Sequence, residues 1–308
     1  MRIAVIGTIN QDTIELPDGQ VKHSYGGLLY SILTLAQLTP SGATILPVLN
    51  LGRDIEGPIR ALLSRFAAIS QEGINVVEEK NNHVYLRYLS NSEREEIQLG
   101  GLPAVSYDQL IPFLDADVFL VNFISGQDLS LETFSRLRAG TGATIYTDIH
   151  SLTLGIDRRG HRYPRPLPQW PRWLAQTDVV QMNKAEARSL SGSRLDEDAD
   201  MRRFGRAVLD AGPSALLVTL DARGSLLATD SGGGLCVERF SPNRPGRIVD
   251  TTGCGDVFLA AFVARHAYSR DLRESSRFAN RVAGIKSGWY GIGEMEKMAG
   301  WSLESKKC

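Results

Sequence analysis

Residues 248–267 read IVDTTGCGDVFLAAFVARHA, and the interpretation of the chain starts from this stretch. Two β-branched residues precede a string rich in turn-forming residues, and an apolar segment typical of a helix follows. Gly253 and Gly255 permit a tight turn and a close approach between backbone and ligand. N–H groups in the first turn of a helix have no partner within it, and the peptide dipoles favour an anion there. The stretch therefore predicts an anion site built from the amides of residues 253–255, with Asp256 beginning the helix. On the residue alone, Asp256 is also explained as a charge partner for the helix N-terminus.

Short apolar runs recur along the rest of the chain, and segments with helical patterns separate most of them. The runs are Ile3–Ile6, Thr44–Leu49, Val118–Val121, Ala143–Tyr146, Val179–Met182 and Ala215–Leu220. Such runs are typical of strands buried on both faces of a parallel sheet. The helical segments are Leu28–Leu38, Ile55–Phe66, Leu131–Arg138, Lys184–Leu190 and Arg202–Ala211. This alternation predicts an α/β fold.

Two segments interrupt that rhythm. Residues 12–25 predict a hairpin, with strands Thr13–Leu16 and Val21–His23 around an Asp18-Gly19 turn. Residues 74–98 predict further antiparallel strands, with turns at Asn81-Asn82 and Asn91-Ser92. Together they predict a small sheet that serves as a lid over a cleft.

The segment 155–173 contains many arginine and proline residues, and its pattern is neither that of a strand nor that of a helix. We expect an ordered surface loop there. The residues leave open whether it is a solvated connection or a contact for an anion or substrate.

Composition excludes several classes of protein. The 308 residues include 34 Lys and Arg against 35 Asp and Glu, a net charge of −1, which argues against binding of nucleic acid by phosphate neutralisation. Three cysteines (Cys236, Cys254 and Cys308) without a CxxC spacing predict neither a disulfide framework nor a zinc site. Since no run is long enough for a signal peptide or a membrane span, we expect a cytoplasmic protein without a membrane partner. The segment IAVIGTIN lacks the later glycines of a dinucleotide-binding turn.

The string DTTGCGDVF resembles the signature D-T-x-G-A-G-D-x-F of the ribokinase-like (PfkB) carbohydrate kinase family. The matching positions are Asp250, Thr251, Gly253, Gly255, Asp256 and Phe258, with Cys254 at the usual alanine position. The resemblance implies a three-layer α/β/α fold with a small β-sheet lid. It divides the chain into a large nucleotide-binding and catalytic domain (residues 1–11, 26–73 and 99–308) and a lid (residues 12–25 and 74–98).

The resemblance continues towards the N-terminus. Gly7, Asn10 and Asp12 resemble the family motif G-x-x-N-x-D, in which the acid contacts sugar hydroxyls. Gly26-Gly27 resembles the GG pair of the family, and residues 52–57 resemble G-x-D-x-x-G. The implied substrate-binding residues are Asn10, Asp12, Gly26, Gly27 and Ser31. On the residues alone, Asn10 is equally a strand cap and Asp12 a turn residue.

A further set of residues resembles the nucleotide site of the family. It comprises Asn183 and Glu186 (motif N-x-x-E), Thr219 and Gly224 (motif T-L-G-x-x-G) and Asn280 beside the adenine pocket. The resemblance implies that these residues bind ATP, with Asn183 and Glu186 holding Mg²⁺ through water. It also implies a monovalent cation such as K⁺ at Asp250 and Thr252. On spacing alone, Asn183 and Glu186 also fit a helix capping box.

The implied activity is transfer of a phosphoryl group from ATP to a hydroxyl of a small sugar-like substrate. Asp256 would accept the hydroxyl proton, and the amides of Gly253, Cys254 and Gly255 would hold the charge on the transferred group. A nucleoside kinase of the same family is one alternative, and a sugar- or nucleotide-binding regulator without turnover is another. The resemblance also suggests a homodimer formed through the lid.

Three positions depart from the family pattern. Ser31 stands where the family often has Asn, Asp221 replaces the Gly of T-L-G, and His150 replaces the Asn of D-P-N after Asp148. Ser31 leaves open an unusual acceptor, and His150 with the arginine-rich segment leaves open a larger or anionic one. Asp221 would repel the phosphates of ATP unless it points away from them or meets a cation. Cys254 either fills space as a small residue or carries a thiol made reactive by the helix N-terminus.

Overall fold

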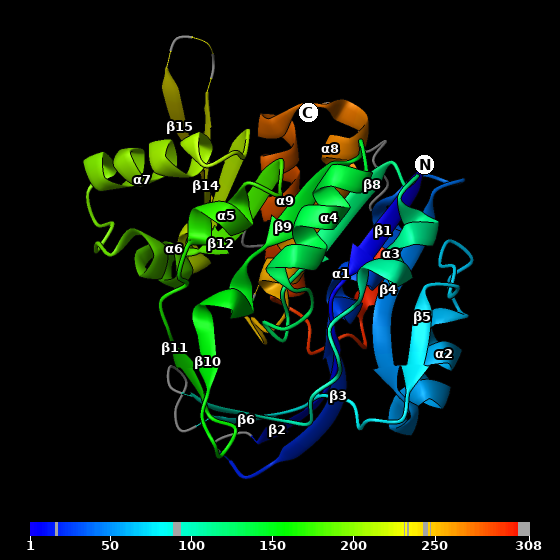
Figure 1. Cartoon of the computed structure of the whole chain (residues 1–308). Coiled ribbons are helices and arrows are strands. Elements are labelled where there is room, and N and C mark those ends of the chain that lie inside the picture. Colours follow the sequence, from blue (N-terminus) through cyan, green and yellow to red (C-terminus); the bar gives the residue numbers. More distant parts are fainter. Residues whose placement is uncertain are drawn as a thin grey trace.

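The computed structural model describes residues 1–15, 18–88, 94–230, 232, 234–242, 246 and 248–300. Its central element is a nine-stranded sheet in the order β15-β14-β13-β12-β9-β8-β1-β4-β5 (Figure 1). The strands are β1 (Arg2–Ile6), β4 (Thr44–Gly52), β5 (Ile74–Val77), β8 (Val118–Asn122), β9 (Thr144–Asp148), β12 (Val179–Asn183), β13 (Ala215–Thr219), β14 (Ser225–Asp230) and β15 (Leu235–Phe240). The strands from β13 to β5 are parallel, whereas β14 and β15 add an antiparallel edge.

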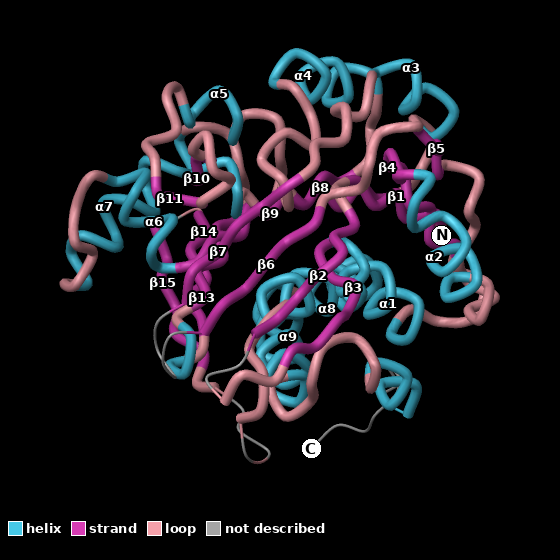
Figure 2. The backbone as a smooth tube through the Cα atoms, turned by 90° about the horizontal axis from the view of Figure 1, so that it is seen from below, coloured by secondary structure: helices cyan, strands magenta, loops and turns pink. Residues whose placement is uncertain are grey.

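The six apolar runs of the sequence all form parallel strands of this sheet, as predicted. Four of the five residues of β1 and all five of β8 are buried, because helices cover both faces of the sheet. One face carries α1 (Leu28–Leu38), α2 (Glu56–Leu63), α8 (Cys254–Ser269) and α9 (Leu272–Lys286). The other carries α3 (Tyr107–Leu110), α4 (Leu131–Gly140), α5 (Trp170–Leu174), α6 (Lys184–Ser191) and α7 (Asp198–Asp210). Figure 2 shows these two helical layers on either side of the strands and confirms the three-layer prediction.

A second sheet of four strands lies apart from the large one, below it in Figure 1. Its order is β3 (Val21–Gly27), β2 (Ile9–Glu15), β6 (His83–Tyr88) and β7 (Arg94–Leu99), with β2 and β6 parallel. The predicted small sheet is confirmed, although its bounds differ. Ile74–Val77 pairs with β4 in the large sheet, and the small sheet extends back to Ile9.

Parts of the predicted hairpins lie outside the described residues, namely Leu16 and the Asn91-Ser92 turn. The lid function and the homodimer through this sheet stay predictions. Val21, Tyr85 and Leu99 of the small sheet are exposed apolar side chains. No helix in the described ranges is long and apolar enough to cross a membrane.

The prediction of a loop over residues 155–173 is wrong. β10 (Leu154–Ile156) and β11 (Arg162–Pro164) form a hairpin, and α5 follows it. Asp157 makes the turn by accepting hydrogen bonds from the N–H groups of Arg159 and His161. The carbonyl of Gly160 accepts a hydrogen bond from the N–H of Gln98 at 2.9 Å, so the hairpin is attached to β7 of the small sheet.

Five short 3-10 turns complete the described elements. They are η1 (Arg53–Ile55), η2 (Ile111–Phe113), η3 (His150–Thr153), η4 (Asp221–Arg223) and η5 (Met295–Gly300). Of these, η3 follows β9 and η4 follows β13, so both lie beyond carboxyl ends of central parallel strands. That edge of an open α/β sheet is where ligands usually bind.

Candidate active site

A cleft of about 970 Å³ opens at the carboxyl ends of the parallel strands. Asp148, Asn183 and Thr219, the last residues of three strands, line one side, and side chains of the small sheet line the other. The predicted site residues on the cleft wall are Asn10, Asp12, Gly27, Asn183, Glu186, Thr219, Gly224, Thr252, Gly253, Cys254, Gly255, Asp256 and Asn280. Gly26, Ser31 and Asp250 are not on the wall.

The turn before α8 has the shape that the sequence predicts, with two differences. Gly253 is the N-cap at φ 75°, so α8 begins at Cys254 and Asp256 lies within its first turn. The N–H of Cys254 donates to the carbonyl of Thr251 at 3.2 Å. Among the described residues, the N–H groups of Gly253 and Gly255 have no hydrogen-bond partner. Two of the three predicted amides are therefore available to an anion.

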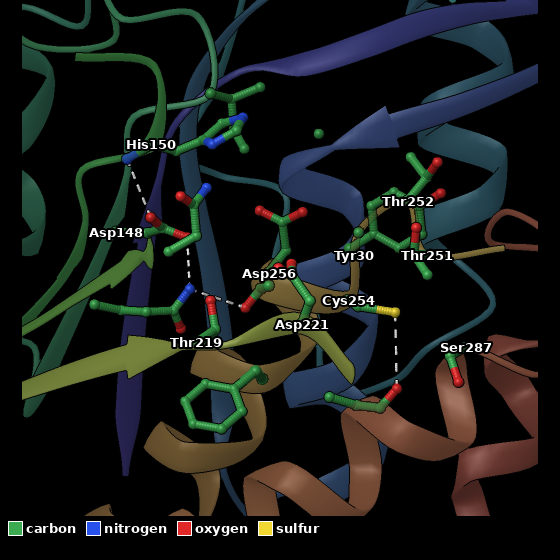
Figure 3. Close-up of a pocket in the computed structure, with 18 of the residues that line it drawn as sticks. Tyr30, Asp148, His150, Thr219, Asp221, Thr251, Thr252, Cys254, Asp256 and Ser287 are labelled. Atoms are coloured by element: carbon green, nitrogen blue, oxygen red, sulfur yellow. Dashed lines mark hydrogen bonds between the residues drawn. The ribbon is translucent and has the colours of Figure 1, made fainter. Parts of the chain in front are cut away.

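Asp256 is half-buried near the centre of the cleft, between Asp148 and the two threonines before Gly253 (Figure 3). Its Oδ1 accepts a hydrogen bond from Nδ2 of Asn122 at 2.7 Å. Burial raises the pKa of Asp256, while His150 and the Asn122 hydrogen bond oppose that rise. Asn122 therefore favours the ionised carboxylate, which is the form that can accept a proton.

Asn122 is a site residue that the sequence analysis missed. It ends the strand VFLVN and is fully buried, and a polar residue at the end of an apolar strand was the available signal. Its Nδ2 also lies 3.5 Å from Oγ of Ser31. Ser31 is itself fully buried, so it lies beneath the cleft, where it contacts the side chain that holds Asp256.

Replacement of Asn122 by alanine should shift the acid limb of the pH–rate profile. The variant loses a donor that stabilises the carboxylate, so the pKa of Asp256 should rise further. With Asp256 as the general base that the family resemblance implies, only the deprotonated form acts, and activity should therefore fall more at pH 6 than at pH 8. Profiles of kcat against pH measure this shift. Equal losses at both pH values would contradict a direct effect on Asp256.

A second cluster surrounds Glu186. Its Oε2 accepts from the N–H of Asn183 at 2.7 Å, and Oδ1 of Asn183 accepts from the N–H of Glu186, so the capping box predicted from spacing is present. Nδ1 of His150 lies 2.9 Å from Oε1 of Glu186. Burial lowers the pKa of His150, but the hydrogen bond and charge of Glu186, with the charges of Asp148 and Asp256, outweigh it and raise this pKa to about 9. His150 is therefore a cation at neutral pH.

Asp148 stands beside this cluster, at the end of β9. Its Oδ2 accepts from Nε2 of Gln181 at 2.9 Å, and that amide is also 3.3 Å from the carbonyl of Gly255. Burial and the charge of Glu186 raise the pKa of Asp148 well above its usual value, although His150 opposes them. Gln181 thereby links the strand end to the first turn of α8.

The donor atoms fit a magnesium ion held through water rather than directly. Both oxygens of Glu186 already accept hydrogen bonds from Asn183 and His150. In the described part of the chain, no group of three or more His, Cys, Asp or Glu side chains is arranged to hold a metal. Mg²⁺ characteristically keeps several waters and binds substrate phosphates, and this set of residues suits that mode.

The small sheet supplies Asn10 and Asp12 to the cleft. Asp12 is 4% exposed, and burial, followed by the charges of Glu96, Asp250 and Asp256, raises its pKa to about 8. A Cβ at Gly26 would collide with Oδ2 of Asp12, so glycine leaves room for that carboxyl group. Gly27 lies at φ 59° against the carbonyl of Thr8, where a side chain would also collide.

Arg162 of β11 was not predicted as a site residue. Its side chain is 4% exposed, and its Nε lies 3.5 Å from a carboxylate oxygen of Glu96. Its Nε and Nη2 have no hydrogen-bond partner among the described residues, although the side chain lines the cleft. The resemblance to known motifs gave no sign of Arg162, because it lies in the arginine-rich segment that departs from the regular pattern.

The other end of the cleft holds the predicted nucleotide residues. Nδ2 of Asn280 donates to Oγ of Ser225 at 2.7 Å and to the carbonyl of Ser276 at 3.0 Å. Gly224 lies at φ 86° directly against the carbonyl of Phe240, where no side chain fits. Asp221 is exposed on η4 and lines the cleft.

Cys254 acts as a small residue rather than a reactive thiol in this environment. Burial and the charges of Asp250 and Asp256 raise the pKa of its thiol to about 11, although Lys286 opposes them. Its Sγ lies 3.7 Å from the carbonyl of Ala283. At neutral pH the thiol is therefore protonated, and the space-filling alternative is the one that agrees with the structure.

Known proteins resemble this chain, some over nearly its whole length and others over part of it. The cytidine kinase of Thermococcus kodakarensis is 25% identical over 292 residues, which cover 93% of this chain and 96% of that protein. The ribokinase of Staphylococcus aureus is 30% identical over 124 residues, 40% of this chain and 39% of that protein. The solved structure of ribokinase from Giardia lamblia has a TM-score of 0.79 at 17% identity and covers 97% of this chain and 99% of that one.

The model of the pfkB family of carbohydrate kinases matches residues 65–296, which include the DTTGCGDVF signature and both clusters around Asp256 and Glu186. The fold, the signature and this match agree with one another. The chain belongs to the pfkB carbohydrate kinase family.

Proposed function

We propose that the protein is an ATP-dependent kinase that phosphorylates a hydroxyl group of a sugar or sugar-like substrate, with Asp256 as the catalytic base. One observation carries this proposal. A carboxylate in the first turn of α8 faces the cleft beside two backbone amides that have no hydrogen-bond partner within the described ranges, and Asn122 favours its ionised form. A base next to an anion site is the arrangement that transfer of a phosphoryl group to an alcohol needs.

In the proposed reaction, the acceptor oxygen attacks the γ-phosphorus of ATP. Its proton passes to Asp256, a new O–P bond forms, and the bond to the β–γ bridging oxygen breaks to release ADP. The transition state is mainly stabilised by positioning and charge. The N–H groups of Gly253 and Gly255 lie at the start of α8, where peptide dipoles favour the negative oxygens of the transferred group.

Each end of the cleft has a separate part in this proposal. Asn10 and Asp12 lie on the small-sheet side and bind acceptor hydroxyls, while Thr219, Gly224 and Asn280 line the nucleotide end. One solved structure with this fold is a ribokinase complexed with ribose and ATP, and Mg²⁺ commonly binds nucleotide phosphates in kinases. Asn183 and Glu186 would hold that ion through water, and when bound it neutralises phosphate charge. His150, a cation held by Glu186, adds positive charge on the same side.

A nucleoside acceptor is the second candidate, and the cytidine kinase similarity favours it. That similarity spans nearly the whole of both chains, whereas the Staphylococcus ribokinase match spans about two fifths of each. A regulator without turnover has less support, because the groups that the proposed reaction needs are all present in the cleft. They are the carboxylate of Asp256, the backbone N–H groups of Gly253 and Gly255, and the side chain of Asn122.

The test is release of ADP from MgATP with ribose, fructose, phosphosugars and nucleosides at equal concentrations. We expect one chemical class to raise the rate at least tenfold above hydrolysis without acceptor. The D256N variant, with the same panel, controls for contaminating kinases. Binding of ATP without turnover on any acceptor would contradict the proposed function and favour the regulator.

Substitution of Asp12 by asparagine should mainly weaken acceptor binding. Hydrogen bonds to a charged group contribute about 1.5–3 kcal/mol, so above pH 8, where Asp12 is ionised, kcat/KM for the acceptor should fall roughly 10- to 100-fold with little change in KM for ATP. In the wild type, the acceptor KM should decrease as pH rises through about 8, because Asp12 then ionises and becomes a stronger acceptor. The variant should lack that dependence.

Asp18→Asn is the matched control for D12N, since Asp18 is exposed in the turn of the same hairpin. It should leave both KM values unchanged. A D12N enzyme with normal acceptor kinetics and an unchanged pH dependence would contradict the role of Asp12.

A further inference from the structure

Lys286, the last residue of α9, has a fully buried side chain. Its Nζ lies 3.3 Å from the backbone carbonyl oxygen of Asp250, 3.3 Å from that of Trp289 and 3.6 Å from Oδ2 of Asp250. The ring of Tyr30 lies 5.3 Å from the same nitrogen. Two carbonyls, a carboxylate and an aromatic face thus surround one buried ammonium group.

The same contacts hold the turn that leads to the anion site. Oδ1 of Asp250 accepts from the N–H of Thr252 at 2.9 Å, and its Oδ2 accepts from the N–H of Gly291 at 3.1 Å. The N–H of Asp250 donates to the carbonyl of Ser287 at the end of α9. Lys286 therefore binds both the backbone and the side chain of the residue from which the turn to Gly253 departs.

This arrangement does not fit the monovalent cation that the family resemblance implies at Asp250 and Thr252. A hard cation binds through several carbonyl and carboxylate oxygens, and here the ammonium of Lys286 already lies against the oxygens that Asp250 offers. Thr252 Oγ1 is the member of the predicted set that has no hydrogen-bond partner among the described residues. Without the oxygens of Asp250, Thr252 Oγ1 alone supplies too few ligands to bind a monovalent cation.

We propose that the ammonium group of Lys286 takes the place of a bound monovalent cation and makes the enzyme independent of K⁺. The ammonium group belongs to the last residue of α9, and the helix dipole favours a cation at that end. It keeps the oxygens of Asp250 and Trp289 together and so fixes the turn before Gly253. Lys286 is a positioning residue, since Asp256 and the amides face the substrates. This inference rests on the proposed kinase function only for its rate measurements.

The first experiment uses the wild-type protein in KCl, NaCl and choline chloride at equal ionic strength. We expect thermal unfolding midpoints that agree within error and kinase rates that agree within twofold. A saturable rise in midpoint or rate with K⁺, absent with choline, would overturn the proposal. The thermal measurement does not need the acceptor, so a failure of the proposed function leaves it interpretable.

The second experiment uses K286A, in which removal of the side chain opens a cavity lined by the oxygens of Asp250 and Trp289. This variant should unfold at a lower temperature in choline chloride, and K⁺ should raise its midpoint by binding the native state. K⁺ should also raise the kinase rate of K286A at least tenfold above its rate in choline chloride. K297A is the matched control, since Lys297 is exposed. Its unfolding midpoint and its rate should be the same in KCl, NaCl and choline chloride.

Two outcomes for the variant are distinct. A folded K286A that K⁺ neither stabilises nor reactivates would contradict the cation role and leave only a packing role. If K286A does not fold, the pair D250N/K286M removes both charges together. That protein should remain folded and should lose rate in every salt. Retention of the wild-type rate would overturn the proposal.

Discussion

Replacement of Asp256 by asparagine should lower kcat by about 10²- to 10⁴-fold, the usual contribution of a general base. The fold should remain intact, because the amide oxygen of asparagine can still accept the hydrogen bond from Asn122. The new side chain has no site for the acceptor proton at neutral pH. Since the amides of Gly253 and Gly255 are unaffected, the KM for ATP should change only a few-fold. Steady-state kinetics with ATP and acceptor varied separately will measure both effects.

Asp198→Asn is the control for this substitution. Asp198 begins α7 with an exposed side chain and is not among the residues that line the cleft, so its variant should have normal kinetics. If D256N weakened ATP binding as strongly as it lowered kcat, Asp256 would be part of the nucleotide site and the assignment of the base would be wrong.

Substitution of Gly253 by alanine should lower kcat by about 10²- to 10³-fold, the range seen when a donor to a developing anion is lost. Gly253 has φ 75°, and an added Cβ would lie 2.5 Å from the ring of Tyr30. Both the strain and the collision must move the turn, and the N–H groups at the start of α8 move with it. A positive φ at a non-glycine residue also costs about 1–3 kcal/mol, so the thermal midpoint should fall.

Gly57→Ala serves as the matched control, because Gly57 lies in α2 with open space around it. Alanine there should raise stability by up to about 1 kcal/mol and leave kcat unchanged. A G253A enzyme that loses stability but keeps its kcat would show that the Gly253 amide has no part in catalysis.

The fold could be predicted from the sequence wherever the burial of a segment leaves a hydrophobic pattern within that segment. The parallel strands other than β5 are buried on both sides over most of their length, and α1 has the bounds Leu28–Leu38 that its pattern predicted. The antiparallel edge strand β15 was not predicted. Its first four residues, Leu235–Glu238, are only partly buried and have no clear hydrophobic pattern. The hairpin of β10 and β11 was not predicted either, since each of its strands has only three residues and the hairpin is held by contacts with β7.

The site could be predicted where its residues lie in one short motif. The turn to Asp256 is local, so its glycines indicate its shape. By contrast, the contact between Asn122 and Asp256 joins residues 134 positions apart, and that between His150 and Glu186 joins residues 36 positions apart. No spacing rule reaches across such distances. Ser31 illustrates the same limit, because its place in a motif indicated the acceptor pocket but not its burial beneath it.

The hydrogen bond between Gln98 and Gly160 has a mechanical consequence. Any displacement of the small sheet must either break this bond or draw the β10–β11 hairpin along, and the chain after that hairpin leads into α5. Trp173 of α5 packs edge-on against Phe123 at 5.5 Å. Through this attachment, a movement of the small sheet would reach an indole ring beside the large sheet, so the intrinsic fluorescence of Trp173 would report movement between the two sheets.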